Sequence, residues 1–312
     1  MLSRRSFLTT TAGAGLALAA NQQAAAQAPA AQPARPSMIV DAQVHLWKAE
    51  APDRPWLAGR KPQLPEPFTI EKLVPLMDEA GVERVVIVPP SWEGNRNDYG
   101  LEAAKRYPGR FAVMGRLPLE DPKSAALLPK WREQPGMLGV RVTFQGAWAK
   151  WLSDGSIEWF WDGCEKAGLP VMFLGTGDMT PFGKIAERYP QLGLVIDHMG
   201  LSGEVVDKGM VPQAIAQSAS LAKYPNMSCK VSSAGAYSTQ PYPWPDMTDH
   251  IKRLFDAFGP QRCHWGTDMT NSLAKATYKQ RIEHFTKELK FMSAVDLDWV
   301  MGRSILQKLK WA

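Results

Sequence analysis

Short apolar runs alternate with amphipathic stretches along most of the chain. The runs have the length of buried strands, and the stretches between them repeat their apolar positions with the period of a helix. Strands that alternate with helices in this way predict βα units and a parallel sheet. The predicted strands are residues 38–42, 84–88, 111–116, 138–142, 170–174, 192–197, 226–231 and 263–266.

The stretches between and after these strands predict helices. Gly81, Gly168 and Gly259 each follow one of them, at the position where a left-handed residue often ends a helix. The last helix is expected to close the bottom or the edge of the sheet. The predicted helices are residues 69–80, 98–107, 124–132, 156–167, 181–188, 213–223, 247–258, 274–288 and 297–309.

Eight strands with helices between them predict a closed α/β barrel of the (β/α)8 TIM type. Open doubly wound sheets more often have about five or six strands. No Gly-x-Gly-x-x-Gly pattern follows the first strand, so a dinucleotide-binding fold has little support.

Long connections follow three of the predicted strands, at residues 46–68, 143–155 and 232–246. In a barrel they lie on the carboxyl-terminal face, where ligands bind. We expect them to form capping loops that wall a partly apolar pocket, although aromatic residues that only pack the loops onto the barrel would give the same pattern. Their aromatic residues include Trp47, Trp56, Trp148, Trp151, Tyr237, Tyr242 and Trp244.

The amino terminus has the pattern of an export signal. Arg4 and Arg5 precede a stretch rich in Thr, Ala and Gly, which resembles a twin-arginine signal peptide over residues 1–27. An Ala- and Pro-rich linker is expected at residues 28–37, followed by one domain at residues 38–312. We therefore expect the export machinery as a partner, a periplasmic or otherwise exported location, and no membrane span, because no segment has 18 consecutive apolar residues.

Charge and cysteine content narrow the classes of partner. The net charge of +5 includes the two arginines of the expected signal, so bulk charge gives little support for nucleic-acid binding, while a small acidic substrate is compatible with it. Cys164, Cys229 and Cys263 are an odd number and lack a zinc-type spacing. We expect buried free thiols, with a bridge between Cys229 and Cys263 as the open alternative.

Three titratable residues fall at the carboxyl ends of predicted strands. His45, His198 and Asp268 follow the first, sixth and eighth strands. Side chains at these ends of a barrel converge on one site. The other histidines, His250, His264 and His284, lie where surface or packing roles are expected.

The sequence around these residues resembles the amidohydrolase superfamily, in the branch called amidohydrolase 2. The motifs are Asp41-Ala-Gln-Val-His45-Leu-Trp47, Val195-Ile-Asp-His198-Met-Gly200 and Trp265-Gly-Thr-Asp268. The likeness extends from Met38 to the end of the chain and is strongest to lactone hydrolases such as the 2-pyrone-4,6-dicarboxylate lactonases. It implies a hydrolase that acts on a small molecule.

Two departures from the family pattern concern the metal. The family's first strand offers two histidines, and here the first of these positions is Gln43; the fifth strand ends in Leu174-Gly175 without the family's histidine or lysine. A neutral carboxamide is a poor zinc ligand. We therefore expect no cofactor, as the resemblance to the pyrone-dicarboxylate lactonases also implies. The alternative is one divalent metal such as zinc, held by the remaining His45, His198 and Asp268.

Lactone hydrolysis without a metal needs an activated water and a place for the developing oxyanion. Asp268 is the expected base, and His45 and His198 are expected to polarise the carbonyl or to hold the water. Gln43 is expected to donate a hydrogen bond to the substrate, or to be a satisfied amide that holds a loop.

Further side chains near the strand ends are candidates for substrate binding. The resemblance implies that Arg141 grips a substrate carboxylate, for which a guanidinium fork is suited. A buried ion pair with a barrel acid is the alternative for this residue. Ser91, Arg116, Trp47 and Tyr237 are the other candidates.

These observations predict an exported hydrolase that opens a small, carboxylate-bearing lactone with water activated by Asp268 and without a metal. Two alternatives remain open. One is a metal-dependent amidohydrolase or decarboxylase of the same superfamily, and the other is a non-catalytic barrel that binds a metabolite.

Overall fold

A computed structural model describes residues 36–312, except for the side chains of residues 146–148. The expected signal peptide, most of the expected linker and the side chain of Trp148 lie outside the described residues. Between residues 36 and 312, no helix has the length and apolar character needed to cross a bilayer.

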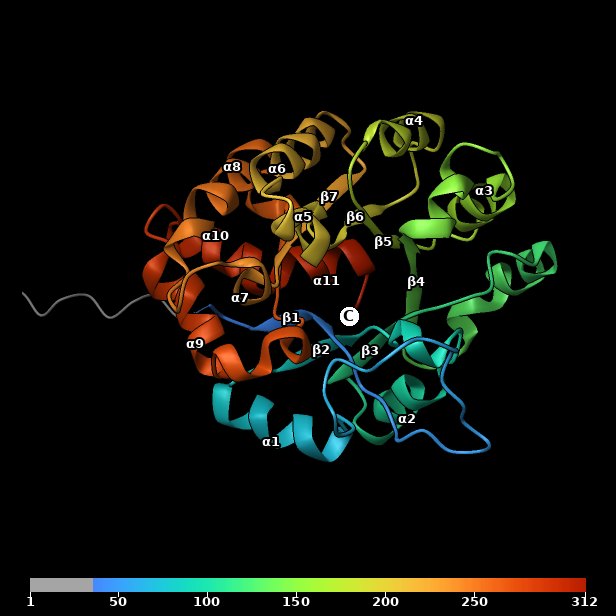
Figure 1. The fold of residues 1–312 in the computed structure, drawn as a ribbon, viewed down its shortest axis with the longest axis horizontal. Coiled ribbons are helices and arrows are strands. Elements are labelled where there is room, and N and C mark those ends of the chain that lie inside the picture. Colours follow the sequence, from blue (N-terminus) through green and yellow to red (C-terminus); the bar gives the residue numbers. More distant parts are fainter. Residues whose placement is uncertain (1–35) are drawn as a thin grey trace, which may run out of the picture. The chain divides into compact units, whose positions relative to one another are not determined.

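The described chain forms a nearly closed barrel of eight parallel strands, each paired with the next in sequence. Figure 1 shows the helices around the outside of these strands. The end of the last strand returns to the first, because the amide of Asp268 donates to the carbonyl of Gln43 at 2.9 Å. The predicted (β/α)8 fold is confirmed. The strands are β1 Val40–Val44, β2 Arg84–Ile87, β3 Phe111–Gly115, β4 Met137–Phe144, β5 Val171–Gly175, β6 Leu194–Ile196, β7 Met227–Ser232 and β8 Cys263–Gly266.

Most helices occur where the sequence predicts them. The α-helices are α1 Ile70–Ala80, α2 Asp98–Arg106, α3 Glu158–Lys166, α4 Thr180–Arg188, α5 Gly203–Asp207, α6 Val211–Ser220, α7 Ala234–Tyr237, α8 Thr248–Phe258, α9 Tyr278–Glu283, α10 Ala294–Asp298 and α11 Ser304–Leu309. The short helices α5 and α7, in the loops after β6 and β7, were not predicted.

Three predicted helices differ in kind from those observed. The helix predicted at 297–309 contains a π-helix at Trp299–Arg303, which lies between α10 and α11. Residues Pro122–Glu133 form a 3-10 helix, with Pro129 inside it, where proline has no N–H for an α-helical hydrogen bond. The segment predicted as one helix at 274–288 is divided. Thr277 begins α9 with a capping box, and a π-helix follows at His284–Glu288.

The last helix closes the amino-terminal end of the barrel, as expected. Ile305 and Leu309 of α11 pack against the apolar side chains that point into the barrel. These inward-facing residues include Val40, Val86, Met114, Met172 and Val195. The lower half of the interior is therefore a mostly apolar layer, in which His264 of β8 bonds to the hydroxyl of Ser304 in α11 at 2.8 Å.

Strand β7 alternates between two environments. Met227, Cys229 and Val231 pack in the apolar layer between strands and helices, whereas Lys230 bonds to residues inside the barrel. The sequence leaves the direction of Lys230 open by one register step, and the structure places it inward. All three cysteines are buried free thiols, which confirms that prediction.

Candidate active site

His45, just after β1, is held by the neighbouring strand. Its Nδ1 lies 2.6 Å from the carbonyl oxygen of Val88. Because a carbonyl only accepts, Nδ1 donates and carries the hydrogen. Nε2 therefore faces the site, 3.1 Å from Oδ1 of Asp268. The imidazole is thus held with Nε2 directed at the carboxylate.

His198 lies in a tight turn after β6. His198 and Met199 adopt left-handed conformations, with φ of 51° and 62°, which turn the imidazole into the barrel. Its Nδ1 lies 2.9 Å from the hydroxyl of Ser232 and 3.1 Å from that of Ser233. Burial lowers the pKa of His198 to about 4, against the opposing effect of the Asp268 charge, so the ring is neutral near pH 7.

Asp268 follows β8 and lies between the two imidazoles. Its Oδ2 lies 3.5 Å from Nε2 of His198, and Ser233 and Asn271 donate hydrogen bonds to the same oxygen. Burial alone would raise the pKa of this carboxyl, but His198 and His45 bring it well below its usual range. The carboxylate is ionised at neutral pH. The structure thus brings together the three residues expected to converge.

Gln43 lies beneath the imidazoles in one fixed orientation. Its Oε1 is 2.6 Å from Nζ of Lys230, and an ammonium group can only donate, so the oxygen must face the lysine. The amide nitrogen then points toward Nε2 of His198 at 3.0 Å and Nε2 of His45 at 3.4 Å. Gln43 is absent from the walls of the cavities described below, which favours a role in holding the imidazoles over one in binding substrate.

This arrangement does not fit the divalent metal that the superfamily implies. A catalytic zinc needs ligand lone pairs from about three side chains. Here Gln43 directs amide hydrogens at the Nε2 lone pair of His198, and the Lys230 ammonium lies behind that amide. Among residues 36–312, no group of three or more His, Cys, Asp or Glu side chains is placed to hold a metal ion. The alternative of zinc on His45, His198 and Asp268 is not supported by this geometry.

A buried charge network supports the site from below. Asp197 forms an ion pair with Nζ of Lys230 at 2.8 Å and accepts a hydrogen bond from Nε of Arg141 at 2.9 Å. Burial would raise the pKa of Asp197, but these two cations hold it well below its usual range. The ion pair that the sequence leaves as an alternative for Arg141 is therefore present. Nη1 of Arg141 also donates to the Thr143 hydroxyl at 2.9 Å.

The three converging residues line a chamber of about 370 Å³. Of the expected binding residues, Ser91, Arg116, Arg141 and Tyr237 also line it, while Trp47 does not. Trp47 is fully buried, with its ring 5.1 Å from that of Trp92 and 6.2 Å from that of Phe68. Trp47 therefore packs the first long loop onto the barrel. The neighbouring Trp92, and not Trp47, lines the chamber.

Several residues of the site were not among those predicted to catalyse or to bind substrate. Lys230 orients Gln43, Asp197 joins Lys230 to Arg141, and Ser233 and Asn271 bond to Asp268. Polar residues at 228, 230 and 232 alternate with apolar ones, which could have indicated a polar inner face of β7. The hydroxyl and amide partners of Asp268 depend on turns that strand patterns do not predict.

The sequence matches the family described as Amidohydrolase over residues 40–303. L-fucono-1,5-lactonase from Burkholderia ambifaria is 29% identical over 236 residues, which cover 73% of this chain and 79% of that protein. 4-Sulfomuconolactone hydrolase from Hydrogenophaga intermedia is 28% identical over 228 residues, which cover 70% of each chain.

Solved structures share the fold. An amidohydrolase from Burkholderia multivorans with bound zinc superimposes with a TM-score of 0.73 at 20% identity, covering 88% of this chain and 100% of that one. A probable 2-pyrone-4,6-dicarboxylic acid hydrolase from Acinetobacter baumannii with bound citric acid gives a TM-score of 0.66 at 18% identity, covering 87% and 99%.

Proposed function

Since this chain belongs to the amidohydrolase family and is a hydrolase, we propose that it opens a small lactone that carries a carboxylate. One observation carries the proposal. An ionised, buried Asp268 lies beside two imidazoles in a chamber whose wall holds Arg116 and Arg141. Both relatives named above are lactone hydrolases by name, which supports the same reaction class.

In the proposed reaction, Asp268 takes a proton from a water molecule held against the lactone carbonyl. The water oxygen bonds to the carbonyl carbon, the ring C–O bond breaks, and the ring oxygen leaves as a hydroxyl. The proton for that oxygen is the one that Asp268 has taken from the water. The product is an open-chain hydroxy acid.

We propose that this reaction needs no metal. Neutral His198 accepts a hydrogen bond from Gln43 through Nε2. This hydrogen bond occupies the lone pair with which the imidazole would otherwise bind a metal. Positive charge for the carboxylate, and for the oxyanion as it develops, comes from the arginines in the chamber wall.

The test is a panel of lactones with and without a ring carboxylate, assayed before and after removal of metals with a chelator. We expect hydrolysis of the carboxylated members, unchanged by the chelator. Asp268→Asn should lower kcat/KM by at least about a hundredfold, because it removes the general base. Asp207→Asn, in the exposed helix α5, is the matched control and should have no effect.

Three results would contradict the proposal. Loss of activity with the chelator, restored by zinc, would overturn the metal-free mechanism. Full activity in Asp268→Asn would overturn the assignment of the base, and binding without hydrolysis of any lactone would favour a metabolite-binding barrel.

A further inference from the structure

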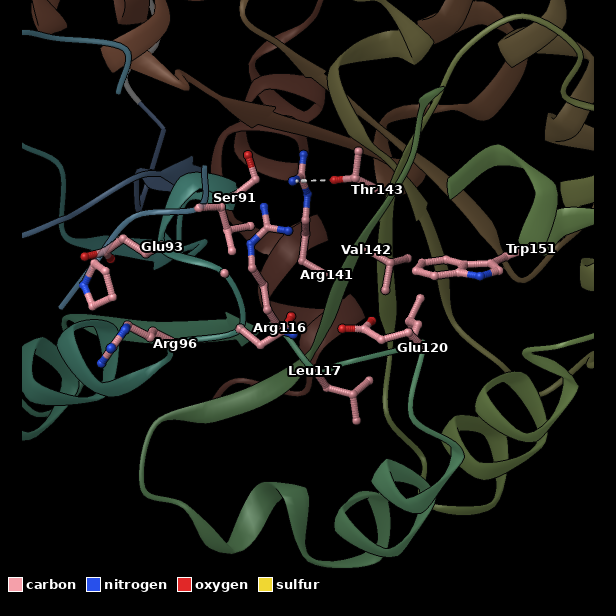
Figure 2. Close-up of a pocket in the computed structure, with 15 residues that line it drawn as sticks. Ser91, Glu93, Arg96, Arg116, Leu117, Glu120, Arg141, Val142, Thr143 and Trp151 are labelled. Carbon is pink, nitrogen blue, oxygen red and sulfur yellow. Dashed lines mark hydrogen bonds between the residues drawn. The ribbon is translucent and has the colours of Figure 1, made fainter. Parts of the chain in front are cut away.

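A second chamber of about 640 Å³ adjoins the one that holds Asp268. The two chambers share four wall residues, Ser91, Arg116, Arg141 and Thr143. They therefore adjoin each other at these residues, and we call them the inner chamber, with the catalytic residues, and the outer chamber. Figure 2 shows the outer chamber with the side chains of Arg116 and Arg141 next to each other in its wall. Each chamber falls within the size range of cavities that bind small molecules.

The residues shared by the chambers carry an excess of positive charge. Arg141 shares the single carboxylate of Asp197 with Lys230, and Arg116 has no carboxylate bound to it among the described residues. Its Nε donates to the carbonyl of Pro89 at 2.6 Å, and its Nη2 is buried without a partner. Burial and the neighbouring charge of Arg141 both lower the pKa of Arg116. A buried guanidinium with an unused donor is costly unless an anion binds it.

Arg116 is held in place independently of any ligand. The side-chain amide of Asn97 accepts from the backbone N–H of Arg116 at 2.8 Å and donates to its carbonyl at 2.9 Å. The backbone of Arg116 is thus clamped, and its side chain is 8% exposed. The anion site is therefore preformed, so binding costs little ordering.

The outer chamber beyond the arginines is apolar at its base and polar at its rim. Leu117, Leu119 and Val142 line it and are each at most 5% exposed. Among its polar wall residues, Glu93 pairs with Arg54 at 2.8 Å. Apolar surface that lines an open cavity gains free energy when an apolar group covers it.

We propose that the outer chamber is a second substrate subsite, which takes an apolar substituent carried by the lactone next to its carboxylate. The inference rests on the lactone hydrolysis proposed above. The lactone carbonyl lies in the inner chamber near Asp268, the carboxylate lies between Arg116 and Arg141, and the substituent extends over Leu117 and Leu119. The substrate class is thus a lactone acid with an aryl or branched alkyl group, larger than a single ring.

The experiment compares a five-membered lactone carboxylate with its analogue that bears a phenyl group next to the carboxylate. The native protein should favour the phenyl analogue at least about tenfold in kcat/KM, the range that a filled apolar pocket gives. Leu119→Trp fills the base of the outer chamber and should remove this preference while leaving kcat/KM for the smaller lactone within about twofold. Leu57→Trp, at the 44% exposed rim, tests the same point if the buried variant fails to fold.

Val295→Trp is the matched control, because Val295 is 65% exposed and lines neither chamber. A preference for the phenyl analogue that survives both blocking variants, or no preference in the native protein, would overturn the subsite. If the native protein hydrolyses no lactone, the proposed reaction is wrong, and this result alone does not refute the subsite. The subsite is then tested by calorimetry, which measures the Kd of the two corresponding hydroxy acids for the native protein and the same variants. A tenfold difference in Kd that the blocking variants remove would support the subsite, and a difference that they leave unchanged would refute it.

Discussion

One amide determines how this site differs from a metal centre. Gln43 is read from the sequence as a missing ligand, but its role depends on which end of the amide faces the histidines. Lys230 settles this, because an ammonium group 2.6 Å from the amide accepts no hydrogen bond. The sequence shows both residues and gives no sign that they meet, since 187 positions separate them.

Gln43→His should convert the site toward zinc binding. The imidazole supplies the lone pair that the amide lacks, so we expect about one zinc ion per chain by calorimetry and elemental analysis, and loss of metal-free hydrolysis. Gln240→His, in an exposed loop, is the control and should bind none at the site. Stoichiometric zinc in the native protein would show that Gln43 does not exclude the metal.

At the scale of the element, strand β7 carries the support for the site. The sequence predicts the position of β7 correctly but not which of its side chains point into the barrel. Both faces of a barrel strand are buried, so burial alone does not distinguish them. The helix predicted at 274–288 shows a second limit. Thr277 caps the start of a new helix and so interrupts the predicted one. The apolar pattern continues across this interruption and therefore does not reveal it.

Lys230→Met on β7 should destabilise the fold and remove the contact that orients Gln43. Methionine keeps the length of the side chain but leaves the Asp197 carboxylate and the Gln43 oxygen without their shared donor. Breaking a buried ion pair costs about 3–5 kcal/mol. Urea unfolding measures the loss, and Lys208→Met, an exposed lysine just after α5, should change stability by less than about 1 kcal/mol. Equal effects of the two substitutions would contradict the network.

At the scale of the whole molecule, buried neutral histidines couple the fold to pH. Burial lowers the pKa of His198 and of His284 to about 4, and that of His264 well below its usual value. Folding therefore depresses these pKa values, so the unfolded chain binds more protons below about pH 6.5. Stability is full above that pH and falls as the pH drops toward 4.

Thermal unfolding between pH 7 and pH 4 should show this loss, at up to about 1.4 kcal/mol per pH unit for each titrating histidine. His284→Phe should reduce the slope, because both ring nitrogens of His284 are buried without a partner and phenylalanine keeps the contact with Trp244. His250→Gln on α8, a partly exposed position, is the control. An unchanged slope in His284→Phe would show that this histidine does not contribute.

The position of α11 has a consequence for how the protein is made. In the chain α11 follows all eight strands, and it packs beneath the apolar side chains inside the barrel together with Met38 and Trp311. Assembly of the strands alone therefore leaves this apolar layer open to water at one end, and the interior becomes dry only when α11 docks there.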